Sequence, residues 1–182
     1  MGFFSRLFGI ESSKPSPPVA ARAAQVRADI QTQGRKVGIR FDPMLIGSLK
    51  EDHQTLFRLY GELVQAKDSG NYANVPKLLG EFKFALQTHV MVENVRFYVF
   101  LQQQLAGDAD TSAFIADVRK QMDGIARAAV KFANTYAVGE PFTPELARGF
   151  SADLAAIGDV LTKRVAMEES RLYPLYSDHR AG

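Results

Sequence analysis

A histidine and a glutamate four residues apart, His89 and Glu93, are the residues whose types and spacing most clearly suggest chemistry. On a helix, this spacing places two side chains on one face, one turn apart. The apolar residues of the same stretch are Phe82, Leu86, Val90, Phe97 and Leu101. A polar pair on an apolar face is costly unless it binds something, and helix bundles often hold a metal ion between facing helices. The pair therefore predicts two ligands of a metal site.

Two further residues extend this predicted site. His53 lies on a helical face that leans toward the core, and Glu168 follows Arg164 by four residues near the C-terminus. Imidazole nitrogens and carboxylate oxygens together suit iron, manganese or zinc. The complete predicted ligand set is His53, His89, Glu93 and Glu168. The sequence leaves open whether these residues hold a single iron, zinc or manganese ion or no cofactor.

Simpler explanations for the same residues also remain open. His89 and Glu93 would form an ordinary pair on a helix surface, and His53 would be a surface residue beside Glu51 and Asp52. The third histidine, His179, lies in a polar tail and is expected to be solvated.

Composition narrows the range of functions. The chain has 182 residues, of which 46% are hydrophobic and 23% charged, as in ordinary globular proteins. Its formal net charge of +2 gives no sign of a nucleic-acid partner. The absence of cysteine excludes thiolate metal sites and fits a cytoplasmic protein. None of the common catalytic motifs is found, so we expect a protein that is not an enzyme.

Apolar periodicity predicts the elements that position these residues. Helical spacing covers residues 43–66, 72–105, 112–136 and 144–173, and Asp42 is expected to cap the first of these helices. Gly124, inside the third helix, is expected to mark a close helix approach. No stretch shows the alternation that a sheet needs. The prediction is an all-α, antiparallel four-helix bundle with an N-terminal extension.

Three regions are expected along the chain. Residues 1–18 form an apolar N-terminal segment and a Pro/Ser linker, residues 19–40 a short helix and connection, and residues 41–178 the bundle. No apolar run reaches the roughly 18 residues that span a bilayer. Residues 1–10 are short and apolar, so they predict either a peripheral membrane contact or a segment that folds back onto the bundle.

The order of these residues resembles the hemerythrin-like (HHE cation-binding) family over residues 43–176. The resemblance rests on Asp52-His53, on His89 and Glu93, and on the run from Glu168 to Pro174. It implies a four-helix bundle that holds a pair of irons between its helices and binds or senses oxygen. By the same resemblance, His53, His89, Glu93 and Glu168 match ligands of that family.

Two departures from the family pattern predict a degenerate site. The family places a histidine on the third helix, and residues 112–136 contain none. It also places a histidine where this chain has Arg164, whose protonated guanidinium cannot donate a lone pair to a metal. We therefore expect a site that does not hold two irons, with Arg164 bridging Glu93 and Glu168 in place of a ligand.

The sequence leads to a function with two alternatives. The first expectation is a non-enzymatic, hemerythrin-like regulatory or partner-binding protein with an incomplete metal site, a protein partner and a homodimeric state. The first alternative is a hemerythrin-like protein that binds a metal such as iron, or that uses the metal to sense oxygen or redox state. The second is an anti-sigma regulator, because residues 157–161 and 164–169 resemble the last helix of the Rsd/AlgQ proteins.

Overall fold

The computed structural model describes residues 21, 39–105, 107–137 and 141–177, and these residues form an all-α structure. Helix α2 spans Leu45–Ser69, α3 Val75–Val92, α5 Ala109–Tyr136 and α6 Pro144–Met167. A π-helical segment, Glu93–Phe97, joins α3 to α4, Tyr98–Gln104. A second one, Glu168–Leu172, extends α6 and is followed by a 3₁₀ turn, Tyr173–Leu175. The prediction of a four-helix bundle is therefore confirmed.

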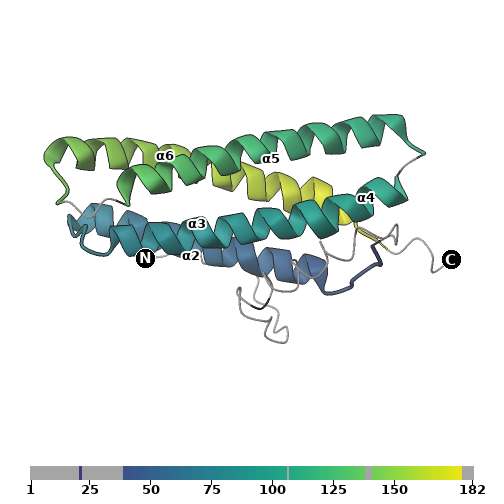
Figure 1. Ribbon diagram of the computed structural model, residues 1–182, viewed down its shortest axis with the longest axis horizontal. Helices are drawn as coiled ribbons and strands as arrows, with labels where there is room; N and C mark the ends of the chain where they lie inside the picture. Colours follow the sequence, from purple (N-terminus) through teal and green to yellow (C-terminus); the bar gives the residue numbers. More distant parts are fainter. Residues whose placement is uncertain (1–20, 22–38, 106, 138–140, 178–182) are drawn as a thin grey trace.

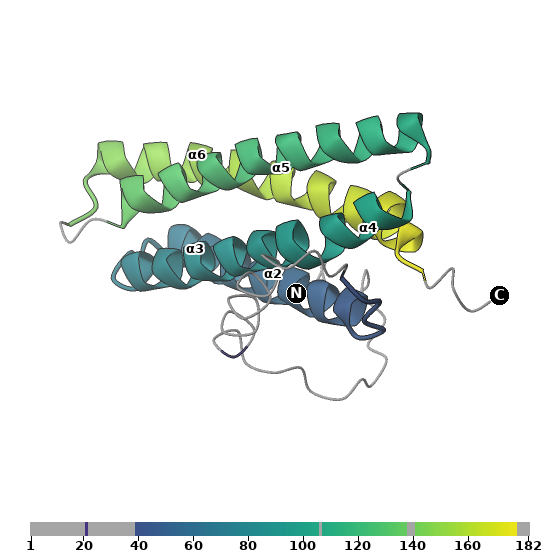
Figure 2. The ribbon, with the colours of Figure 1, turned by 45° about the vertical axis from the view of Figure 1, so that its right-hand side comes forward.

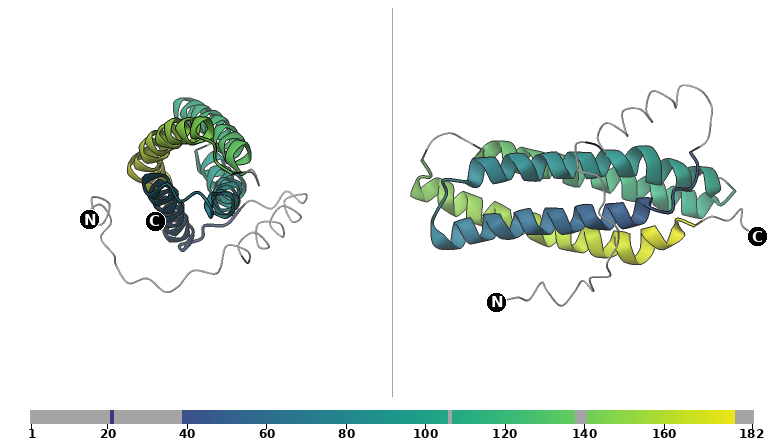
Figure 3. Two further views of the ribbon diagram at one scale, coloured as in Figure 1. Left: turned by 90° about the vertical axis from the view of Figure 1, so that its left-hand side faces the viewer. Right: turned by 90° about the horizontal axis from the view of Figure 1, so that it is seen from below.

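The helices close into a ring. Helix α2 packs on α3, α3 on α5, α5 on α6, and α6 on α2. Figures 1 and 2 show them side by side along the long axis, with α4 continuing the direction of α3. The view along the bundle in Figure 3 shows the four rods around a common centre. Each face of the bundle is thus bounded by two helices, and all four helices contribute to one core.

Local signals explain where the helices begin and end. The side chains of Asp108 and Thr143 accept the backbone N–H groups of Thr111 and Leu146, capping α5 and α6. Helix α2 ends at Gly70, whose φ of 67° is in the left-handed region. The expected cap of α2 was misplaced, because Met44 occupies the N-cap position and Asp42 instead accepts from the Met44 N–H.

The core consists of two apolar clusters. The larger cluster includes Leu56, Leu59, Leu63, Phe82, Leu86, Met122, Phe132, Phe150, Leu154 and Leu161. The smaller cluster includes Leu45, Leu49, Val92, Phe97, Phe100, Leu101, Ile115, Val118 and Leu172. Between them lies a set of buried polar side chains, here called the polar layer: Asp52, His53, Thr88, His89, Glu93, Arg164 and Glu168. Along α2, for example, His53 follows the smaller cluster at Leu49 and precedes the larger one at Leu56.

The closest approach to a helical glycine occurs at Gly158 of α6. A Cβ there would clash with the hydroxyl group of Tyr60, so the Tyr60 ring packs directly over the glycine. Around Gly124 no heavy atom would lie within 4 Å of an added Cβ. The expectation that Gly124 marks a close contact was therefore wrong, because open space surrounds an added Cβ at that position.

Several sequence predictions fall outside this description. Residues 1–18, most of 19–40, and His179 lie outside the described residues. Within the described part of the chain, none of the helices is long and apolar enough to cross a membrane.

Candidate metal centre

The four predicted ligands come from three helices and meet in the polar layer. His53 lies on α2, His89 on α3, and Glu93 and Glu168 are the first residues of the two π-helical segments. Their exposed fractions are 1%, 1%, 0% and 1%. Ligand atoms of His53, His89 and Glu168 lie within 4.8 Å of one another. The structure thus excludes the surface positions that the sequence had left open for the two histidines.

Both imidazole rings have a carboxylate beside Nδ1: in His53 this contact is a hydrogen bond, and in His89 it is a close ion pair without hydrogen-bond geometry. The Nδ1 atom of His53 is 2.8 Å from Oε1 of Glu169, and Nδ1 of His89 is 3.4 Å from Oδ2 of Asp52. Metal-binding histidines commonly donate their second ring N–H to a carboxylate, which fixes the ring and increases the basicity of the ligating nitrogen. Here this arrangement points both Nε2 atoms into the layer.

The spacing of the inner donor atoms suits one metal ion. Nε2 of His53 is 3.1 Å from Oε2 of Glu168, and Nε2 of His89 is 3.7 Å from Oε2 of Glu93. Ligand bonds of about 2.1 Å place adjacent donors about 3.0 Å apart in an octahedron and about 3.4 Å apart in a tetrahedron. Oε2 of Glu93 is fully buried and has no hydrogen-bond partner, which is costly for a carboxylate oxygen. The residues therefore fit a cation held between them.

Arg164 binds one carboxylate of the layer. Its Nε donates to Oε1 of Glu168, its Nη2 donates to the hydroxyl oxygen of Tyr98 at 2.8 Å, and its Nη1 donates to the carbonyl oxygen of Val118 at 3.1 Å. The predicted salt bridge is thus formed with Glu168. The expectation that Arg164 also bridges to Glu93 was wrong, because Glu93 accepts its hydrogen bond from Tyr173 instead.

The mutual influence of these groups appears in their pKa values. Burial alone would lower the pKa of His53, but hydrogen bonds to Glu168 and Glu169 raise it to about 9. Burial and the charge of Glu168 raise the pKa of Glu93 to about 7. Burial also acts to raise the pKa of Glu168, yet the hydrogen bond from His53 and the charges of His89 and Arg164 give a net lowering. Without metal, the layer therefore contains a protonated histidine beside an ionised Glu168.

Two tyrosines that were missed by the sequence analysis border the polar layer and form hydrogen bonds to its members. The Tyr173 hydroxyl donates to Oε1 of Glu93 at 3.1 Å and lies 3.2 Å from Nε2 of His53. Tyr98 accepts the hydrogen bond from Arg164. A repeated spacing could have revealed them, because each tyrosine follows its glutamate by five residues in His89-Glu93-Tyr98 and Arg164-Glu168-Tyr173.

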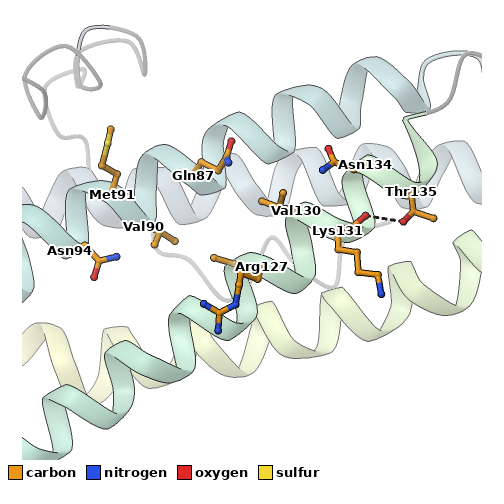
Figure 4. Close-up of a pocket in the computed structure, with 10 residues that line it drawn as sticks. Gln87, Val90, Met91, Asn94, Arg127, Val130, Lys131, Asn134 and Thr135 are labelled. Carbon is orange, nitrogen blue, oxygen red and sulfur yellow. Dashed lines mark hydrogen bonds between the residues drawn. The ribbon is translucent and has the colours of Figure 1, made fainter.

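A groove lies away from these donors, between α3 and α5 (Figure 4). It has a volume of about 860 Å³. Apolar side chains of Val90, Met91 and Val130 line it together with the cationic side chains of Arg127 and Lys131. Since none of the predicted ligands lines this groove, it is separate from the metal centre.

A ring of four helices around a buried layer of histidine and carboxylate side chains defines the class of bundle proteins that hold a cation in the core. The family model of the hemerythrin HHE cation binding domain matches residues 44–176, and the chain belongs to this family. The match covers all four helices of the bundle. Comparisons with curated proteins and with solved structures gave no significant match.

Proposed function

We propose that this protein binds a single metal ion through His53, His89, Glu93 and Glu168, and acts as a non-enzymatic metal-binding or metal-sensing protein. The observation that carries the proposal is the arrangement of the two imidazoles, whose Nδ1 atoms face outer carboxylates while their Nε2 atoms face Glu168 and Glu93. Two nitrogens and two carboxylates suit iron, manganese or zinc, and iron is our first choice.

The surroundings of Arg164 support one ion over two. Its guanidinium binds Glu168 and lies where the family pattern has a histidine ligand, so it adds positive charge close to any second metal. Helix α5 reaches this point with Val118, whose carbonyl oxygen accepts from Arg164. With Arg164 in place of one histidine and no histidine in residues 112–136, the chain lacks the two nitrogen donors that the family pattern has there.

The number of metal ions per chain tests the proposal. Protein stripped with a chelator and then loaded anaerobically with ferrous iron, and separately with manganese or zinc, is expected to retain one ion per chain after desalting, as measured by elemental analysis. Two ions per chain would contradict the role assigned to Arg164. Retention of none of the three metals would favour the alternative in which the layer is only a salt-bridge network.

Metal binding is expected to depend on pH, because ions and protons compete for the same atoms. The pKa of His53 is raised from 6.5 to about 9 in the folded protein, so protonated His53 stabilises the metal-free fold. This contribution is complete below about pH 6.5 and is lost as the pH rises through 9. The pKa of Glu93, raised to about 7, acts in the same direction at lower pH. The stabilisation by zinc should therefore grow as the pH rises from about 6.5 to 9. Thermal unfolding with and without zinc across this interval measures it, and a flat difference would contradict it.

The regulatory or partner-binding role remains a prediction, as do the homodimer and the cytoplasmic location. The groove between α3 and α5 supports a partner, since its apolar lining and two exposed cations would suit an apolar protein segment that carries acidic residues. The family match gives no support to the anti-sigma resemblance. A binding assay with purified RNA polymerase components and the full chain would test that alternative directly.

A further inference from the structure

We propose that Tyr173 is a fifth ligand of the centre and that its phenolate makes the site selective for ferric iron. The inference rests on the single-metal function proposed above and adds a residue with no counterpart in the ligand set predicted from the sequence. It concerns which ion the centre prefers and how that ion is recognised.

The position of the Tyr173 hydroxyl carries the inference. Tyr173 is 3% exposed, and its oxygen lies 3.1 Å from Oε1 of Glu93 and 3.2 Å from Nε2 of His53. Both distances are close to the separation of about 3.0–3.4 Å expected between neighbouring donors on one metal. The phenol oxygen therefore lies as close to the neighbouring donor atoms as those donor atoms lie to one another.

The π-helical segment after α6 explains how Tyr173 reaches this position. In an α-helix, a residue five positions after Glu168 would lie about 140° around the axis and point away from the layer. Here the backbone N–H of Tyr173 donates to the carbonyl of Glu168, an i to i+5 bond that underwinds the helix. This underwinding turns Tyr173 back toward the face that carries Glu168. Such segments occur often at functional sites.

The charges of the donors favour a trivalent ion. The carboxylates of Glu93 and Glu168 with the phenolate of Tyr173 carry three negative charges, which match ferric iron better than a divalent ion. Oxygen donors of this kind also suit hard cations. On binding, the phenol O–H bond breaks, the proton passes to solvent buffer, and the oxygen lone pair forms the bond to iron. The hydrogen bond from Tyr173 to Oε1 of Glu93 is then released, so that this oxygen is free to bind as well.

Tyr98 provides a matched control within the same protein. It follows Glu93 by the same spacing, and its N–H donates to the carbonyl of Glu93 in the same way. Its hydroxyl, however, accepts from Arg164 at 2.8 Å. Tyr98 is therefore the equivalent tyrosine on the side of the layer that Arg164 occupies, and we expect it not to bind the ion.

The experiment compares wild type, Tyr173→Phe and Tyr98→Phe after loading with ferric nitrilotriacetate, with iron content measured on each sample. Phenolate bound to ferric iron gives a charge-transfer band in the visible region. Wild type and Tyr98→Phe should show this band, whereas Tyr173→Phe should lack it. Tyr173→Phe should also lose ferric affinity by at least about 10-fold while its zinc affinity changes less.

The outcomes separate this inference from the proposed function. One bound iron without a visible band in wild type, or a band that persists in Tyr173→Phe, would overturn the role of Tyr173 and leave the single-metal site intact. Wild type that binds no metal would overturn both. If Tyr173→Phe does not fold, resonance Raman spectra of ferric wild type grown with ring-deuterated tyrosine decide the matter. Phenolate vibrations that shift with the label support the inference, and their absence contradicts it.

Discussion

Replacing Arg164 by alanine is expected to lower the free energy of unfolding of the metal-free protein by about 3–5 kcal/mol, because it breaks a buried ion pair and leaves Glu168 with His53 as its remaining cationic partner. The hydroxyl of Tyr98 and the carbonyl of Val118 would lose the same donor. Urea unfolding of chelator-treated protein, followed by circular dichroism, measures the loss.

Two comparison variants isolate the buried interaction. Lys163→Ala removes the neighbouring cation, which pairs with Asp159 in solvent, and should change stability by less than about 1 kcal/mol. Arg164→Ala combined with Glu168→Gln removes both charges and should be less destabilised than the sum of the single variants. If Arg164→Ala lowered the free energy of unfolding by less than about 1 kcal/mol, solvent would have to reach Glu168, and the polar layer would be hydrated.

Replacing His89 by alanine is expected to abolish most of the stabilisation by metal. An ion at about 100 times its dissociation constant stabilises a protein by about 2.7 kcal/mol. Loss of one ligand among four should weaken affinity by more than about 100-fold, beyond the effect of losing an outer partner. At the same metal concentration, the stabilisation would then fall to about 0.4 kcal/mol or less. Zinc is the probe, and unfolding with and without zinc gives the difference.

The difference between unfolding with and without zinc does not include the loss of stability that the substitution itself causes, because each variant is compared with its own metal-free form. Gln54→Ala serves as the control, since Gln54 is exposed and adjacent to His53 in sequence. It should retain the full difference. If His89→Ala also retained it, the zinc would be bound elsewhere, and the centre described here would not be the metal site.

Much of this architecture follows from spacing that the sequence displays. Helical periodicity gave the four rods, because each long helix has to bury one apolar face. The His89-Glu93 pair could be found because two polar side chains interrupt such a face. The position of His53 beside them was predicted from its place on a core-leaning face of the first helix, and the family resemblance agreed with it.

Other features depend on three-dimensional packing that the sequence does not display. The underwound segments at Glu93 and Glu168 have no known residue signature, and without them Tyr98 and Tyr173 fall on the wrong face of an ideal helix. No local pattern in the sequence marks Glu169, whose carboxylate binds Nδ1 of His53. Arg164 pairs with Glu168 and not with Glu93 because its guanidinium is held by the carbonyl oxygen of Val118 on α5.

The two apolar clusters on either side of the polar layer have a consequence for exchange. They leave the donors almost without contact with solvent, so an ion held there is shielded from direct attack by a chelator. Dissociation of the ion requires a local opening of the helix packing. The dissociation rate then depends on how often the helices open rather than on the strength of the ligand bonds. Mutations that loosen the distant apolar packing would therefore speed the loss of the ion without touching any of its ligands.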